Sequence, residues 1–248
     1  DSRLVLDGGT LKNASSGQLL SAGNTTVTAD ALDNQGELQA ETLDVTADRW
    51  NNSGSTRAAS GLSAQLTGQL ENSGTLRSSQ ALELQAADIR NGGTLAADRL
   101  TLRAPQLSNS GTLQGSSALV LTTETLSNLS GAQLLSGKGL TLDLDTLNND
   151  GLLQVSEALD VQARRFTNNG SVQAAQLGLD IAGTLSNGAA AALLAEQNAT
   201  VKAQTLDSGG TLAANALTLS GGTLTNRGAL QGDNALSATF GQLTNASG

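Results

Sequence analysis

Residues 70–86 read LENSGTLRSSQALELQA, and this stretch decides the fold. Its apolar residues alternate with polar ones, first over 70–76 and again over 82–86. A period of two is typical of a β-strand with one buried face, and no stretch of the chain sustains the i, i+3, i+4 spacing of an amphipathic helix. The glycine, asparagine and serine residues between the runs favour turns, because they allow positive φ or bond to nearby backbone.

The same unit recurs along the whole chain at intervals of about nineteen residues. Its anchor is an apolar residue followed two positions later by asparagine, and successive anchors stand 18 to 21 residues apart. Twelve of the thirteen anchors have the asparagine, and Ser208 replaces it in the other. The apolar anchor residues are Leu11, Leu32, Trp50, Leu70, Ile89, Leu107, Leu126, Leu147, Phe166, Leu185, Leu206, Leu224 and Leu243.

Strand-forming units of this length predict a β-helix. A single unit cannot bury its own apolar face, so consecutive units must stack in register. With two or three short strands per unit, we predict an all-β solenoid of about thirteen coils of about 19 residues. This single domain covers residues 1–248, and each coil adds about 4.8 Å along the stacking axis.

The composition fits a narrow aliphatic interior. Only three residues are aromatic, Trp50, Phe166 and Phe240, although 38% of the chain is apolar. A compact core of this size normally uses many aromatic rings, whereas layers of aliphatic side chains fill a thin solenoid. Trp50 and Phe166 stand in the anchor positions, so we interpret them as core residues. A sugar-stacking surface at Trp50 is the alternative interpretation.

The asparagines of the anchors predict a second column of side chains inside the solenoid. Amide groups at the same position of consecutive coils can hydrogen-bond to one another and to the turn backbone. A hydrophobic residue there would leave buried turn groups without partners. We call this set the Asn column and expect a structural role for Asn13, Asn34, Asn52, Asn72, Asn91, Asn109, Asn128, Asn149, Asn168, Asn187, Asn226 and Asn245.

Several kinds of site are excluded by the residue types that the chain lacks. With no Cys and no His, there is no thiolate nucleophile, no imidazole base and no Cys or His metal ligand. The glycine pairs 92–93 and 209–210 are not followed by the Gly-x-Asp of a repeat calcium site. We therefore expect no catalytic site, no metal and no cofactor.

Paired carboxylates leave one enzymatic alternative, a polysaccharide lyase or hydrolase. A glycosidase needs two carboxyls roughly 5–10 Å apart, one of them with a pKa raised by burial. The strand pattern places no long loop around any acidic pair, so we interpret the acids as a solvated surface. The candidates are Asp44, Glu83 and Asp160 on outward strand positions, and Asp143, Asp145 and Asp150 close together in sequence.

The charge and hydropathy pattern limits the partners. The net charge is −9, which argues against nucleic acid and against an anionic membrane surface. The longest uncharged apolar run, residues 188–195, is far shorter than the roughly 20 residues that span a bilayer, so we expect no membrane insertion. The amino-terminal residues have no signal-peptide pattern.

The Leu-x-Asn-x-Gly-x-Leu and Ala-Leu-x-Leu-x-Ala units, taken together, resemble the filamentous haemagglutinin repeat over residues 4–248. This resemblance implies a right-handed parallel β-helix, a hand that periodicity alone does not give. It also implies the shaft of a large exoprotein secreted by the two-partner route to the bacterial cell surface. Both filamentous adhesins and contact-dependent growth-inhibition toxins have such shafts, and the resemblance does not distinguish them.

Other parts that the resemblance implies are not recognisable in the sequence. We find no amino-terminal secretion domain, which would meet the outer-membrane partner, and no carboxy-terminal toxin domain. We therefore expect an internal fragment that presents an adhesive or toxin element, and expect end-to-end association through uncapped coils. A direct adhesive surface for a receptor or polysaccharide on a target cell is the alternative, at the longer coils near residues 129–138 and 188–199.

Overall fold

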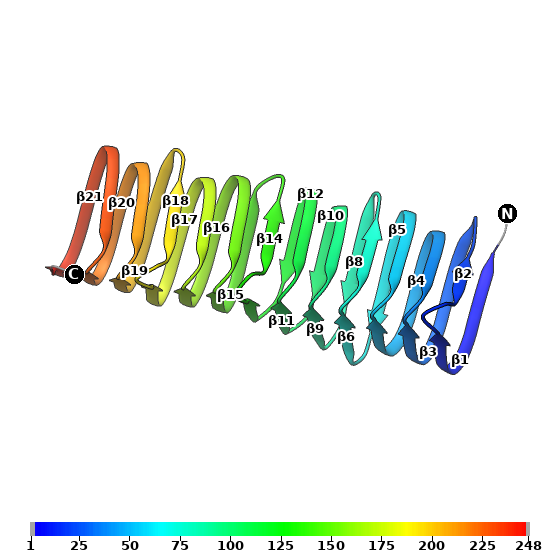
Figure 1. The fold of residues 1–248 in the computed structure, drawn as a ribbon. Coiled ribbons are helices and arrows are strands. Elements are labelled where there is room, and N and C mark those ends of the chain that lie inside the picture. The colour runs from blue at the N-terminus through cyan, green and yellow to red at the C-terminus, as the bar shows by residue number, and fades with distance from the viewer. Residues whose placement is uncertain (1–2, 247–248) are drawn as a thin grey trace. The chain divides into compact units, whose positions relative to one another are not determined.

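The structure is a computed structural model that describes residues 3–246. Every regular element among these residues is a β-strand, and the strand pairings within the sheet are parallel, as between β1 and β3 and between β16 and β17. The chain divides into two compact units, Asp1–Thr123 and Glu124–Gly248. Figure 1 shows that the strands of each unit follow one another as stacked coils.

The first unit contains twelve strands: β1 (Leu4–Asn13), β2 (Gln18–Leu20), β3 (Asn24–Asn34), β4 (Glu37–Asn52), β5 (Ser55–Leu66), β6 (Gln69–Asn72), β7 (Thr75–Ser78), β8 (Ala81–Gln85), β9 (Asp88–Asn91), β10 (Thr94–Arg103), β11 (Gln106–Asn109) and β12 (Thr112–Thr122). The second unit contains nine: β13 (Thr125–Asn128), β14 (Gln133–Ser136), β15 (Leu140–Asn149), β16 (Leu152–Asn168), β17 (Ser171–Asn187), β18 (Ala192–Ala195), β19 (Asn198–Ser208), β20 (Thr211–Asn226) and β21 (Ala229–Asn245).

One coil consists of three strand segments, which are clearest where they form separate strands. After the turn at Gly74, the chain runs through β7, β8 and β9 before it reaches the next turn. In other coils the segments join into one long strand, and a register shift marks the corner, as between Ala97 and Arg99 in β10. The three-segment coil agrees with the two or three strands per unit expected from the sequence.

Leucine columns form the core because equivalent positions of successive coils pair directly. Leu82 pairs with Leu62 on one side and with Leu100 on the other, and all three side chains are almost fully buried. Such registers follow the repeat, since a slip by one residue would turn every apolar side chain to the solvent. The predicted all-β solenoid is confirmed, whereas its right-handed sense stays a prediction of the resemblance.

Two of the three aromatic residues lie in the core, as interpreted from the sequence. Trp50 pairs with Leu32 and Leu70 and is 1% exposed, and Phe166 is fully buried. Burial excludes Trp50 as a sugar-stacking surface, because a stacking ring must present a face to solvent. The indole Nε1 has no hydrogen-bond partner, which is an unfavourable state for a buried donor.

The turn glycines are required for a reason that differs from the expected positive φ. Among residues 3–246, only Gly131 and Gly221 have φ in the left-handed range. At Gly74, a Cβ atom would instead lie 2.0 Å from the carbonyl oxygen of Gly54 in the neighbouring coil. The backbones of consecutive turns therefore stack too closely for any side chain. Of the two turn properties expected from the sequence, these turns show hydrogen bonds to nearby backbone, as from Asn72 to the Gly74 carbonyl, and not positive φ.

Candidate functional site

The Asn column runs through the interior of the first unit as a continuous chain of amide hydrogen bonds. The Nδ2 group of each asparagine donates to the Oδ1 atom of the next, at 2.7–2.8 Å, for Asn13, Asn34, Asn52, Asn72, Asn91 and Asn109. These side chains are at most 5% exposed. The second N–H of Asn72 also points to turn carbonyls, those of Gly74 and Thr94, at 3.3 and 3.2 Å.

The second unit has an Asn column with the same hydrogen bonds and one irregularity at Ser208. Hydrogen bonds of 2.8–2.9 Å between side-chain amides join Asn128, Asn149, Asn168 and Asn187 in turn. Another of 2.8 Å joins Asn226 to Asn245. At Ser208 the shorter side chain leaves a longer contact of 3.5 Å from Asn187 Nδ2 to the hydroxyl oxygen. All the sequence-predicted residues of the column thus occupy equivalent positions within their own unit.

Thr56 also joins the Asn column, at a position where the repeat predicts an apolar residue. Its hydroxyl donates to Asn52 Oδ1 at 3.0 Å and accepts from Asn34 Nδ2 at 3.1 Å, in a fully buried position. Equivalent positions in neighbouring coils hold Leu38 and Leu76. A polar residue within an otherwise leucine column was the signal in the sequence that could have found it.

Most of the candidate carboxylates project from flat outer faces. Asp44 and Glu83 are exposed, and they stand two coils apart because Ser63 pairs with both. Asp160 is exposed on the second unit, and Asp150 accepts a hydrogen bond from the Asn169 amide at 2.8 Å. Neither Asp44 nor Glu83 is buried as the general acid of a glycosidase must be.

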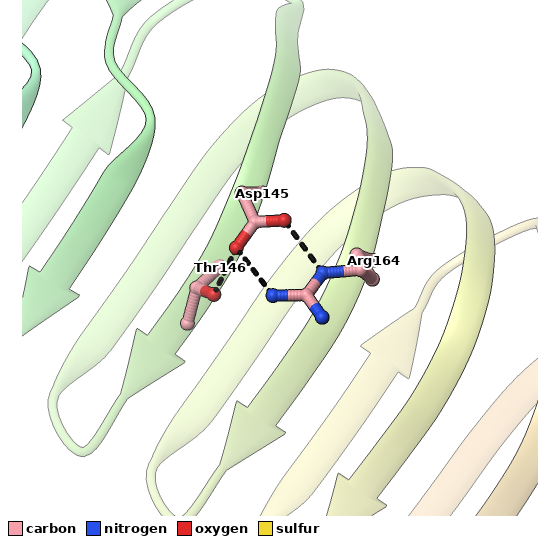
Figure 2. A network of polar contacts seen from close by, with 3 residues as sticks. All are labelled: Asp145, Thr146 and Arg164. Atoms are coloured by element: carbon pink, nitrogen blue, oxygen red, sulfur yellow. Dashed lines mark hydrogen bonds and ion pairs between the residues drawn. The ribbon is translucent and has the colours of Figure 1, made fainter.

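Asp145 forms an ion pair between two coils on the surface of the second unit (Figure 2). Arg164, in the next coil, donates to it through Nε at 2.7 Å and Nη2 at 3.1 Å. The Arg164 hydrogen bond, followed by that from the Thr146 hydroxyl, lowers the pKa of Asp145 to about 2. This shift keeps the carboxylate ionised, which is opposite to the raised pKa that a general acid needs. The exposed pair therefore joins two coils rather than forming a proton donor.

The longer coils, where an adhesive surface was expected, end in tight turns. Ala132 N–H donates to the Leu129 carbonyl at 3.0 Å, and Ala191 N–H donates to the Gly188 carbonyl at 2.9 Å. Each is the hydrogen bond of a four-residue β-turn. The remaining residues of both regions are largely β14 and β18, so the added residues form compact corners and not protruding loops.

Residues 3–246 contain neither a cluster of metal-ligating side chains nor a helix that could span a membrane. No group of three or more carboxylate, His or Cys side chains is placed to hold a metal ion in this part of the chain. None of the same residues forms a helix that is long and apolar enough to cross a membrane.

Comparison with known proteins agrees with this repeat geometry. The profile of the family described as Haemagglutinin repeat matches three overlapping stretches, residues 2–49, 40–98 and 95–156. These stretches cover more than half of the chain, and each contains at least two complete coils. The chain belongs to the haemagglutinin repeat family. No solved structure gives a significant match to it.

Curated proteins with similar haemagglutinin repeats carry the name CdiA. The chain is 31% identical over 270 residues to Toxin CdiA of Escherichia coli, covering 98% of this chain and 8% of that protein. It is 37% identical over 133 residues to Deoxyribonuclease CdiA of Dickeya dadantii, covering 53% and 4%. It is 30% identical over 223 residues to tRNA nuclease CdiA of Yersinia mollaretii, covering 89% and 8%.

The matched haemagglutinin repeats form a small part of each relative. The chain spans 8% or less of the length of these three proteins. The nuclease names describe the whole relatives, and no nuclease activity follows for the repeats from the match. The similarity to these proteins shows that this chain is a repeat region.

Proposed function

We propose that this chain is a segment of a stiff shaft in a large secreted bacterial exoprotein. The shaft presents an adhesive or toxin element at the cell surface to a target cell, and the coils set its reach. The observation that carries this proposal is the Asn column, which repeats one set of hydrogen bonds in nearly every coil. The same contacts recur coil after coil, so added coils lengthen a unit without a change in its cross-section.

Stiffness is supported by the three kinds of contact that join each coil to the next. Parallel backbone pairs cover most residues, as in the fourteen register pairs between β16 and β17. Hydrogen bonds within the Asn column join consecutive coils through buried polar side chains, and the turn glycines let the turns of consecutive coils stack closely. A bend between coils would stretch all three at once, and buried polar groups are costly to leave unpaired.

The route of secretion is the second part of the proposal. Likeness to CdiA proteins supports two-partner secretion, in which an outer-membrane partner exports the exoprotein. The partner would act through a secretion domain outside these 248 residues. Nothing in the described geometry favours a polysaccharide-cleaving site or a protruding adhesive loop over a shaft.

A replacement experiment tests the proposal directly. The stretch of Toxin CdiA that aligns with this chain would be replaced by the 248-residue chain. We expect the chimera to reach the cell surface and to keep its toxicity toward target cells. A Gly/Ser-rich linker of equal residue number is the control, since a flexible chain does not hold its ends apart. Equal toxicity of the linker chimera would show that a stiff shaft is not needed.

A further inference from the structure

A groove on the first unit is lined by side chains that the shaft does not use. It lies over β5, β7, β10 and the beginning of β12, and has a volume of about 490 Å³. Such a volume lies within the range of small-molecule sites. The buried Ala96 and Ala97 form part of its floor, and the small side chain of Ala96 leaves open space beside Arg77, its partner in the neighbouring coil.

Arg57 and Arg77 project into this groove from consecutive coils. The two residues pair directly in the parallel register of β5 and β7, which places their Cα atoms about 4.8 Å apart. Both side chains are exposed, and within residues 3–246 neither guanidinium group forms a hydrogen bond or an ion pair. Like charges placed directly opposite each other on neighbouring strands are destabilising.

Elsewhere the molecule places opposite charges on neighbouring coils. In the second unit, Asp145 meets Arg164 (Figure 2), and the same kind of pair joins Glu157 to Lys138 and Asp180 to Lys202. Each of these carboxylates neutralises the cation that stands on the adjacent coil. The Arg57–Arg77 pair has no such carboxylate between its members, so a bound anion would relieve its repulsion.

We propose that this groove binds a phosphate group, either as free phosphate or as a phosphate monoester carried on a sugar. Two guanidinium groups present ten N–H donors in planar forks, which match phosphate oxygens. A phosphate monoester carries a charge of about −1.5 to −2 at neutral pH, so it balances both arginines better than one carboxylate can. The hydroxyls of Ser79 and Ser116 and the amide of Gln114 also line the groove and can bond to sugar hydroxyls.

Asp98 places one negative charge at the other side of the groove. Its carboxylate accepts a hydrogen bond from the Ser117 hydroxyl at 2.8 Å and remains exposed. Two arginines and this one aspartate give the groove a charge of +1, in a chain whose net charge is −9. This site goes beyond the proposed shaft function, because a stiff shaft requires no ligand. If the chain does not bind phosphate, the expected result of the chimera experiment stays the same.

The test is calorimetric titration of the 248-residue chain with glucose 6-phosphate, inorganic phosphate and glucose at low ionic strength. We expect glucose 6-phosphate to bind and glucose not to bind. Arg57→Gln and Arg77→Gln should each weaken binding about tenfold, the value of one charge-assisted hydrogen bond. Asp98→Asn should strengthen it, because it removes the nearest repelling charge. Equal affinity for both phosphates would assign the site to the free anion, and tighter binding of the sugar phosphate would assign it to a glycan.

Arg103→Gln is the matched control, since Arg103 lies outside the groove, where its Nη1 donates to the Thr122 hydroxyl at 3.3 Å. It changes the net charge of the chain by the same amount and should leave the affinity unchanged. The proposal is overturned if neither glucose 6-phosphate nor inorganic phosphate binds, if both groove variants bind phosphate as the unsubstituted chain does, or if Arg103→Gln weakens binding equally. Arg57 and Arg77 are exposed and lack partners, so their replacement leaves the fold intact.

Discussion

At the scale of single residues, asparagine suits the buried column because its amide is both donor and acceptor. Asn72 accepts from Asn52 at 2.8 Å and donates to Asn91 at 2.7 Å, so each coil repeats the same exchange. A leucine column would pack well but leave the turn carbonyls without these donors. A column of carboxylates would repel itself.

Replacement of Asn72 by leucine is expected to lower the free energy of unfolding by about 1–3 kcal/mol, because Asn52, Asn91 and the turn carbonyls lose a buried partner. Urea unfolding followed by circular dichroism measures the change. Asn51→Leu is the control, since Asn51 is an exposed neighbour of the column, and its effect should stay within about 0.5 kcal/mol. Equal stability of the Asn72 variant and the unsubstituted chain would contradict a stabilising role.

Asp145 gives a second prediction at this scale, on pH dependence. Its pKa is lowered from 3.8 to about 2 in the folded protein, mainly by Arg164 and then by Thr146. A lowered folded pKa means that the ion pair stabilises the fold above pH 3.8 and ceases to do so as the pH falls through 2. Titration of the side-chain carboxyl carbon by NMR should give a midpoint near 2.

Arg164→Gln should move the Asp145 midpoint back toward 3.8, and Thr146→Val should move it by a smaller amount. The order of the two shifts follows the strength of the two hydrogen bonds, since a charged donor stabilises a carboxylate more than a hydroxyl does. A midpoint that does not change in Arg164→Gln would show that the pair does not form in solution.

At the scale of elements, the turns are limited by how closely consecutive backbones approach. Gly74→Ala is expected to destabilise the chain, because the new Cβ would lie 2.0 Å from the Gly54 carbonyl oxygen. Gly61 in β5 is the matched control, since a Cβ there would meet nothing within 4 Å. Gly61→Ala should instead stabilise by about 0.4–1 kcal/mol through a less flexible unfolded chain. Thermal unfolding measures the change in midpoint temperature for each variant. Changes of the same sign in both variants would refute this explanation.

At the scale of the whole molecule, the leucines of the last strand are less buried than their partners in the preceding coil. Leu236 and Leu243 in β21 are 50% and 51% exposed, whereas Leu217 and Leu224, which pair with them in β20, are buried. We expect the isolated 248-residue chain to associate through this surface, because exposed apolar side chains and open strand edges favour pairing. Sedimentation velocity at increasing concentration measures it.

Leu243→Lys should reduce this association, because a charge at the open face opposes stacking. The control is Val120→Lys, which introduces the same charge at an exposed apolar residue within the stack, 42% exposed on β12. A chain that stays monomeric at high concentration, with or without either substitution, would contradict the prediction.

The repeat determined the strands, the leucine columns and the inward asparagines, because these depend only on which residues recur at the coil spacing. A period of two assigns each side chain to a face, and the spacing of about 19 residues assigns each coil its neighbour. Trp50 and Phe166 were placed correctly for the same reason.

Only the tertiary structure decided what depends on atoms from two coils at once. The close approach of Gly54 and Gly74, the hydroxyl of Thr56 within the Asn column and the Asp145–Arg164 pair are distances between coils, and no local pattern contains them. The groove at Arg57 and Arg77 is of the same kind, since the two arginines are twenty residues apart in sequence and become neighbours only through register. The sequence alone thus determined the fold and its core, and stacking decided which surface residues meet.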